Sequence, residues 1–366
     1  MRYAEYQTDN VSSAGRKAKK MKGIKPKIVY LEILRIIAIF GVVFCHTENF
    51  GVHHYVETTN PVNYWFGIFL ASVVEYCVPL FFMVTGAVLL NREESIIYVY
   101  RHRLLKMAIV TVLANLVQYL WHFRNYWQEI SLKRFLHLLH EGSASGNLWF
   151  LYAYLSLLMV LPFLQRLVRA IPDDRWFLYL FVGWILLNDL LTIPENYLGW
   201  NHTRLELPIL ESYVVTSIMG YYVEHRSGEI FLKRKNVLIL LGISALLTLL
   251  GMFVNYSQIS GSQYITMGYL FSQVYALTIF VTVRYVCHNR KMPQKLESIL
   301  CFAGAGTFGT YLIETQLRTW FYPVYETLAP RIHAYPAAFV WVAVCVLVGI
   351  LLANLFKRIP VVGKLI

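Results

Sequence analysis

Long apolar segments recur along all 366 residues, and no other feature constrains the fold as much. A helix needs about 20 residues to cross the hydrocarbon layer of a membrane, and most of the segments are near that length. They lie at about 28–46, 62–90, 104–121, 147–165, 176–193, 209–224, 236–254, 264–286, 298–319 and 336–356. Strands of a membrane barrel would instead alternate polar and apolar residues. The sequence therefore predicts an all-α, polytopic membrane helix bundle with about ten transmembrane helices.

The composition excludes other classes of protein. Hydrophobic residues make up 57% of the chain and charged residues 15%, against roughly 25% charged residues in a soluble domain. This argues against a disordered chain, a disulfide scaffold and a typical soluble enzyme. The five cysteines lie in or beside apolar segments, without the spacing of a disulfide framework or a metal site. We expect them to be small buried hydrophobic residues.

The net charge of +12 is concentrated on one side of the predicted membrane. The N-terminal tail and the loops on the same predicted side of the membrane hold 26 Lys and Arg residues, eight of them before the first span. The loops on the opposite side hold five. By the positive-inside rule, both termini are cytoplasmic, and the basic residues contact lipid headgroups rather than nucleic acid. We expect residues 1–26 to be a basic disordered tail and residues 27–366 to form one membrane domain in the cell membrane. No cleavage site follows the first apolar stretch, which is therefore a retained helix.

The first span carries ionisable residues that are costly in a membrane. Arg35 and His46 are eleven residues apart, which is about three helical turns plus 20°, so both project from one face. At about 1.5 Å per residue they lie roughly 16–17 Å apart along the axis. Glu32 is three residues before Arg35, on nearly the same stripe. Either Glu32 and Arg35 pair to ease insertion and His46 is interfacial, or the three form a polar track with a titratable base at its outer end.

Other polar residues can be placed by depth. Glu314 is about 16 residues into an outward-running span, at a height close to that of His46. Asn147 opens the fourth span at the outer boundary, where it is either a helix N-cap or part of a site. Glu75 lies near the middle of the second span. We therefore expect a polar cluster in the outer leaflet.

The inner leaflet is predicted to gather Arg35 with Arg101 and Arg103, at the cytoplasmic end of the third span. These two arginines either bind an anion or only anchor the helix. Near the outer end of the first span, His53 and His54 follow His46 closely. No carboxylate or cysteine accompanies them at ligand spacing, so we expect no metal.

Several short motifs occur in order on this predicted topology. They are Arg35 and His46 with ten residues between them, Pro79-Leu80-Phe81-Phe82 followed by Thr85-Gly86, Tyr100–Lys106, Leu148-Trp149-Phe150-Leu151, Gly220-Tyr221-Tyr222, Thr307–Ile313 and Ile359–Ile366. Over residues 27–366 the chain thus resembles the membrane acyltransferases called acyltransferase 3. In that family, histidine is more common at the positions of Asn147 and Glu314. Many members also carry an added esterase-like domain, which we do not expect in this chain.

The resemblance implies transfer of an acyl group, usually acetyl from acetyl-CoA, to a hydroxyl of a glycan or lipid-linked glycan. In this interpretation His46 is the general base or briefly carries the acyl group, and Glu314 or Glu32 orients its imidazole. Arg35 with Arg101 or Arg103 binds the phosphates of the acyl-CoA. Asn147, Trp149 and Glu75 bind or orient the acceptor. The pantetheine arm would run along the first span, so that a cytoplasmic donor reaches an acceptor outside.

Two other functions are compatible with the buried charges. A proton-coupled secondary transporter would use the same Glu, Arg and His residues, although the sequence shows no inverted repeat. A membrane scaffold would bind a lipid-linked glycan without transferring anything to it. A transport assay without acyl donor, and an assay for thioester cleavage, separate these alternatives from a transferase.

Overall fold

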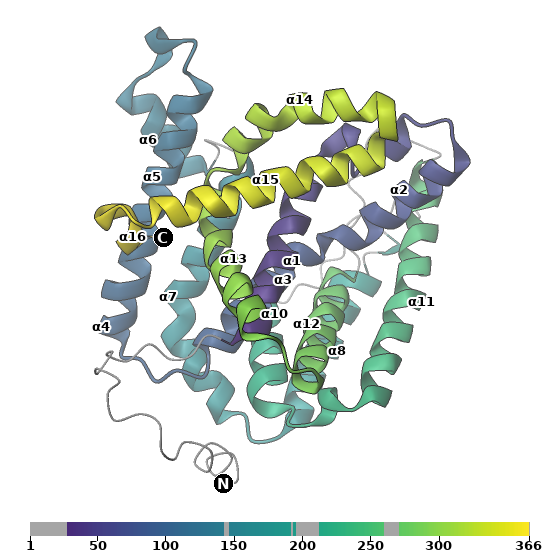
Figure 1. Cartoon of the computed structure of the whole chain (residues 1–366). Helices are drawn as coiled ribbons and strands as arrows, with labels where there is room; N and C mark the ends of the chain where they lie inside the picture. Colours follow the sequence, from purple (N-terminus) through teal and green to yellow (C-terminus); the bar gives the residue numbers. More distant parts are fainter. Residues whose placement is uncertain (1–27, 143–145, 192, 195–211, 260–270, 366) are drawn as a thin grey trace.

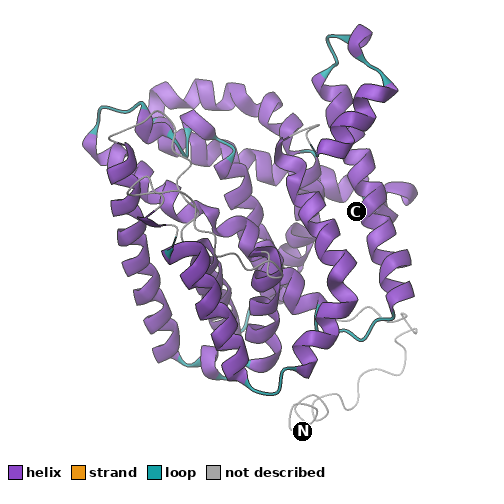
Figure 2. Cartoon of the chain, turned by 180° about the vertical axis from the view of Figure 1, so that it is seen from behind, coloured by secondary structure: helices purple, strands orange, loops and turns teal. Residues whose placement is uncertain are grey.

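The computed structural model describes residues 28–142, 146–191, 193–194, 212–259 and 271–365 (Figure 1). Among these residues every regular element is helical and none is a strand (Figure 2). In apolar segments like these, a helix satisfies its backbone hydrogen bonds internally, which a membrane requires. The predicted all-α membrane bundle is confirmed. The tail predicted for residues 1–26 lies outside the described residues.

Each of the ten predicted segments contains a helix. The long elements are α1 Val29–Cys45, α2 Pro61–Val73, α3 Cys77–Leu89, α5 Leu105–His122, α6 Leu132–Glu141, α7 Trp149–Ala170, α8 Asp174–Ile185, α10 Ser212–Tyr221, α11 Arg234–Ile259, α12 Ser272–Asn289, α13 Gln294–Leu312, α14 Glu314–Ile332 and α15 Ala334–Phe356. The short elements are η2 Glu48–Phe50, η3 His54–Val56, η4 Val74–Tyr76, α4 Ile96–Val99, η5 Tyr100–Leu104, η6 Trp127–Glu129, η7 Gly146–Leu148, η8 Leu186–Leu190, η9 Tyr222–Arg226, η10 Ile230–Leu232 and α16 Pro360–Leu365.

The chain is a multi-pass membrane protein. Within the described residues, five helices are long and apolar enough to cross a membrane: Pro61–Leu89, Ile96–His122, Gly146–Ala170, Arg234–Phe253 and Ala334–Phe356. The pair α13 and α14 gives a sixth if it is counted as one span. The remaining predicted segments hold shorter or less apolar helices, so the count of ten stays a prediction.

The predicted span 298–319 is not one straight helix. α13 ends at Leu312 and α14 begins at Glu314, with a bend of 95° between them. Neither Gly nor Pro stands at the break, where Ile313 leaves the helical conformation with ψ 9°. The break occurs where the buried carboxylate of Glu314 meets side chains from two other parts of the chain.

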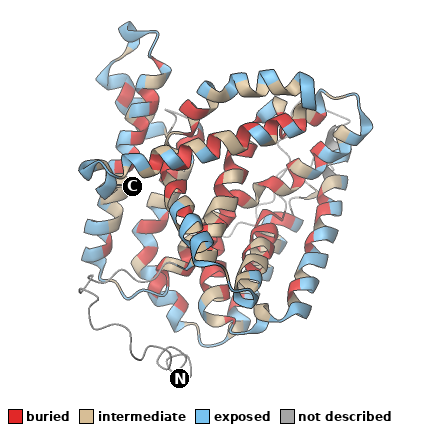
Figure 3. Cartoon of the chain, in the orientation of Figure 1, coloured by how far each residue is buried: buried red, intermediate tan, exposed pale blue. Residues whose placement is uncertain are grey.

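α1 lies inside the bundle, whereas α11 lies at its edge (Figure 1). α1 packs against α3, α12, α13 and α15, and its residues Leu34, Ala38, Ile39 and Val43 are inaccessible to solvent. Along α11, large apolar side chains such as Leu246 stand exposed, as a lipid-facing helix requires (Figure 3). The helix that carries Arg35 is therefore surrounded by protein, and its polar residues face other helices.

Two glycines let α3 and α10 cross closely. A Cβ atom on Gly86 would overlap the backbone of Ser217, and one on Gly220 would overlap the backbone of Met83. Small residues at helix crossings allow this kind of backbone contact in membranes. Two of the sequence motifs thus meet where α3 crosses α10.

Candidate active site

A cavity of about 830 Å³ lies within the bundle. Both Arg35 and His46 line it, together with residues of α3, α5, α7 and α13. The prediction that these two side chains share one face of the first span is therefore met by the geometry. A single cavity joins a guanidinium in the second turn of α1 to an imidazole just past its last turn.

His46 follows the last turn of α1 and is held by Glu314. The Nδ1 atom of His46 lies 3.0 Å from Oε1 of Glu314, whose side chain is fully buried. The second oxygen of Glu314 accepts a hydrogen bond of 2.9 Å from Nδ2 of Asn147. Arg318, one turn further along α14, places its Nε 3.5 Å from Oε1 of Glu314. The carboxylate is thus compensated by three neighbours, as a buried charge must be.

This geometry selects the reactive nitrogen of His46. A carboxylate only accepts hydrogen bonds, so Nδ1 carries the proton and Nε2 is left as the basic atom. Among the described residues, Nε2 of His46 makes no hydrogen bond, and the side chain lines the cavity. Because a buried group fixes its ring, the imidazole can present Nε2 to a substrate in one orientation.

The bend between α13 and α14 positions Glu314. Instead of continuing α13 outward, Glu314 starts α14 and directs its carboxylate at His46 and Asn147. The hydroxyl of Tyr311 donates a hydrogen bond of 2.5 Å to the carbonyl of Asn147, which ties the end of α13 to η7. Glu314 was predicted at the height of His46, and the structure adds a direct contact.

Asn147 is not the N-cap of α7. It lies in η7, and the cap position of α7 is Leu148, which makes no side-chain cap hydrogen bond. The amide of Asn147 instead binds Glu314 and donates to Oγ1 of Thr315 at 3.1 Å. Of the two interpretations of Asn147, the structure therefore favours the one that places it in a site.

Arg35 forms an ion pair with Glu32 at the other end of the cavity. Nη1 of Arg35 lies 2.7 Å from Oε1 of Glu32, while Oε2 of Glu32 is buried without a hydrogen-bond partner among the described residues. Glu32 packs directly against Gly304 of α13. Glu32 is fourteen residues from His46, about 21 Å along a helix. The structure therefore does not support Glu32 as the group that orients the imidazole.

The cations near Arg35 differ from those predicted. Arg101 and Arg103 are not among the described residues that line the cavity, whereas Lys106 and Lys357 are. Lys357 donates to the carbonyl of Ala305. Neither lysine was predicted for the site, because each resembles a charge that anchors a helix at the membrane surface. One signal was available, since Lys106 lies inside the predicted third span, where a cation needs a reason.

Arg103 serves a different partner. It donates two hydrogen bonds to Glu94, with Nε 2.6 Å from Oε2 and Nη2 2.5 Å from Oε1. These bonds from Arg103 hold the pKa of the Glu94 carboxyl below its ordinary value. Arg103, which lies in η5, thus fastens the start of the third predicted span to the segment before α4. Arg101 is exposed, which agrees with its interpretation as an anchoring residue.

Glu75 and Trp149 also line the cavity. Glu75 lies in η4, the turn that interrupts the second predicted span, and Trp149 opens α7 with half of its surface exposed. Asn147 lines the cavity beside Trp149. The structure therefore brings the three residues predicted to meet the acceptor to the same cavity as His46.

The histidines after α1 do not form a cluster. His53 packs edge-on against Tyr55 and His54 against Tyr335. Burial lowers the pKa of both, which disfavours their charged forms. In the part of the chain that the structure describes, the group with metal-ligand geometry contains neither of them nor His46.

Comparison with known proteins confirms the resemblance over most of the chain. The family model Acyl_transf_3, described as an acyltransferase domain, matches residues 28–356. That range contains every residue described above at the cavity except Lys357. No curated protein and no solved structure matched the chain.

Proposed function

The chain belongs to the acyltransferase 3 family and is a membrane-bound acyltransferase, and we propose that it transfers acetyl from acetyl-CoA to a hydroxyl of a cell-surface or lipid-linked glycan. The donor binds from the cytoplasm, the acceptor binds outside, and His46 is the general base. In this proposal the protein lies in the cell membrane with both termini in the cytoplasm, in accord with the 26 to 5 distribution of basic residues.

One observation carries the proposal: Arg35 and His46 line a common cavity, and His46 is oriented by a buried carboxylate. The two residues are about 16–17 Å apart along α1, which is comparable to the length of an extended pantetheine arm. A donor with its phosphates at Arg35 would therefore place its thioester near His46. Such alignment turns a reaction between two molecules into one within a complex.

The donor end offers three cations for anionic phosphates. Arg35, Lys106 and Lys357 line the cavity. A guanidinium binds phosphate oxygens in pairs, and an ammonium supplies a compact charge. Glu32 neutralises part of the charge of Arg35 in the structure. We therefore expect Arg35 to exchange some of its contact with Glu32 for the phosphate when the donor binds.

The transfer step needs only the groups at His46. Nε2 of His46 takes the proton of the acceptor hydroxyl as that oxygen attacks the thioester carbonyl. The carbon–sulfur bond then breaks and coenzyme A leaves as the thiolate. His46 passes the proton that it took from the hydroxyl to the sulfur of this thiolate. Glu314 stabilises the transient imidazolium through Nδ1. Asn147, Trp149 and Glu75 lie where the acceptor must be held, since they line the same cavity.

The proposal can be tested with the purified full-length chain in lipid vesicles. Labelled acetyl-CoA is supplied with lipid-linked glycans, and the acceptor is analysed by mass spectrometry for an added acetyl group. Wild-type protein is expected to acetylate the glycan and release coenzyme A. Transport of a solute across the vesicle membrane without any thioester cleavage would identify a transporter instead. Comparing surface glycans of cells with and without the protein then identifies the natural acceptor.

A further inference from the structure

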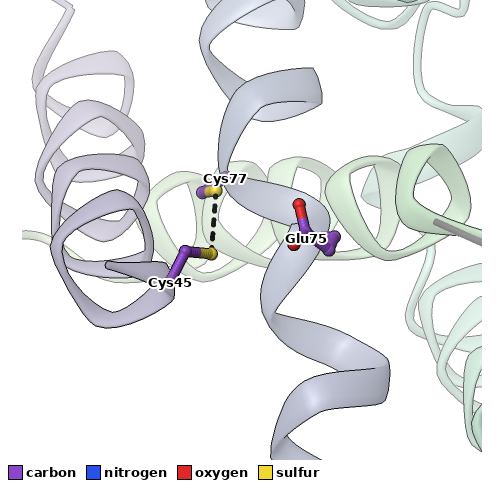
Figure 4. Close-up of side chains that lie close together, drawn as sticks. All are labelled: Cys45, Glu75 and Cys77. Atoms are coloured by element: carbon purple, nitrogen blue, oxygen red, sulfur yellow. Dashed lines mark hydrogen bonds between the residues drawn. The ribbon is translucent and has the colours of Figure 1, made fainter. Parts of the chain in front are cut away.

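Two cysteines and a carboxylate meet where α1 ends beside the interrupted second span (Figure 4). Cys45 is the last residue of α1, Glu75 lies in η4, and Cys77 is the first residue of α3. The Sγ atoms of Cys45 and Cys77 are 3.8 Å apart. A carboxylate oxygen of Glu75 and the two sulfurs all lie within 4.8 Å of one another.

We propose that Cys45, Glu75 and Cys77 bind a thiophilic divalent cation of the zinc type. Zinc holds cysteine sulfur at about 2.3 Å in a tetrahedron, which places two sulfurs about 3.8 Å apart. The observed separation already has this value. A zinc-bound oxygen at about 2.1 Å would lie about 3.6 Å from each sulfur. Glu75 must therefore approach the sulfurs by at most about 1.2 Å, which a change of side-chain rotamer supplies.

The position of the cluster makes it accessible to an ion. All three ligand residues line the same cavity as His46. Three protein ligands leave the fourth position of a tetrahedron free, and a fourth ligand can approach through the cavity. An open fourth position is typical of zinc sites that bind water or a substrate atom, whereas structural zinc sites are closed by four protein ligands.

Ion binding at the cluster changes both its protons and its charge. Binding of M²⁺ to two thiols releases two protons and forms two metal–thiolate bonds. With the carboxylate of Glu75, the three ligands then carry one negative charge more than the metal neutralises. The occupied site therefore carries a net charge of −1, and the two released protons pass to the solvent.

This site could not be predicted from the spacing of the residues along the chain. Cys45 and Cys77 are 32 residues apart, so no short ligand motif joins them, and the sequence predicted no metal. Only the packing of α1 against η4 and α3 brings the sulfurs together. An ion there would cross-link α1 to the second span next to His46. The inference concerns ion binding alone and does not depend on the proposed acetyl transfer.

The test uses purified full-length protein in detergent under reducing conditions, without acyl donor. Co²⁺ serves as a spectroscopic probe, because a thiolate-to-cobalt charge-transfer band reports sulfur ligation. One Co²⁺ per chain is expected, displaced by Zn²⁺. Cys45→Ser and Cys77→Ser should each weaken binding at least tenfold and reduce the band. Glu75→Gln should weaken cobalt binding but keep the charge-transfer band, because both sulfur ligands remain. Cys287→Ser, which alters a cysteine outside the cluster, should bind like the wild type.

A second measurement on the wild type covers the case in which a cysteine variant fails to fold. Zn²⁺ is expected to protect Cys45 and Cys77 from alkylation, measured by peptide mass spectrometry, and to leave Cys287 reactive. Absence of stoichiometric binding, equal binding by Cys45→Ser, or a disulfide between Cys45 and Cys77 in the purified protein would each overturn the proposal. Loss of acetyl transfer with intact cobalt binding would leave it standing.

Discussion

The two ends of α1 carry different kinds of polar site. At one end His46, Glu314 and Asn147 satisfy one another, and Glu314 is fully buried. At the other end Arg35 pairs with Glu32, and one buried oxygen of Glu32 has no hydrogen-bond partner within the described residues. The first site is complete in itself, and the second is not.

The difference follows from what each end must do. A general base works only if its ring is fixed at the reacting atom, so its supporting hydrogen bonds have to be present before substrate arrives. An anion-binding site gains its missing contacts from the ligand, and its cations can adjust as the ligand enters. An incompletely satisfied ion pair is therefore expected where a phosphate binds, and a fully satisfied one where chemistry occurs.

The largest effect is expected at the complete site. His46→Ala should lower kcat for acetyl transfer by roughly 10²- to 10⁴-fold, because the general base is lost. The KM for acetyl-CoA should change little, since the phosphates bind at the far end of α1. Steady-state kinetics in lipid vesicles measure both. His140→Ala, an exposed histidine on α6, is the matched control. Transfer at the native rate by the His46 variant would remove His46 from the reaction.

A smaller loss is expected when the support of His46 is weakened. Glu314→Gln keeps the shape of the side chain but removes the charge that stabilises the imidazolium. Hydrogen bonds to charged groups contribute about 1.5–3 kcal/mol, so kcat should fall roughly 10- to 100-fold. Glu326→Gln changes an exposed residue of the same helix and should have no effect. An unchanged kcat in the Glu314 variant would show that the contact between Glu314 and His46 has no catalytic role.

The incomplete site should respond in KM rather than in kcat. Arg35→Gln is expected to raise the KM for acetyl-CoA roughly tenfold, because charge-assisted hydrogen bonds to phosphate are lost. Arg166→Gln, an exposed arginine on α7, is the control. Arg101→Gln tests the sequence-based prediction, and its position outside the cavity predicts a smaller change than for Arg35. If only kcat responded to Arg35→Gln, the two ends would not differ as described.

Periodicity and depth predicted much of this site. Eleven residues of helix put Arg35 and His46 on one face, and counting along spans put Glu314 near His46. Such arguments work for residues on one helix, or at one depth, because helical geometry is regular. They do not predict which faces of different helices meet, and so the contact of Asn147 with Glu314 appeared only with the fold.

The features that escaped prediction depend on packing between distant segments. Lys106 and Lys357 carry the same charge as anchoring residues, and only the cavity distinguishes them. The bend at Ile313 was not predicted, because neither Gly nor Pro stands at the break. In the structure the bend coincides with the tertiary contacts of Glu314. The pair of Cys45 and Cys77 arises in the same way, from helices that the sequence separates.

The smallest effect should come from Glu94, and it separates a structural arginine from a donor-binding one. Glu94→Gln removes the pair with Arg103, which should cost under about 1 kcal/mol of stability and leave the KM for acetyl-CoA unchanged. Because the folded state lowers the pKa of Glu94, the contribution is complete above the ordinary pKa and disappears as pH falls through the lowered value. The difference in Tm between wild type and variant should therefore be constant near neutral pH and shrink in acid. Thermal unfolding measured across that range checks the sign, with Glu93→Gln at the neighbouring exposed position as the comparison. A raised KM in Glu94→Gln would instead mean that Arg103 reaches the donor, and that the sequence-based assignment was the better one.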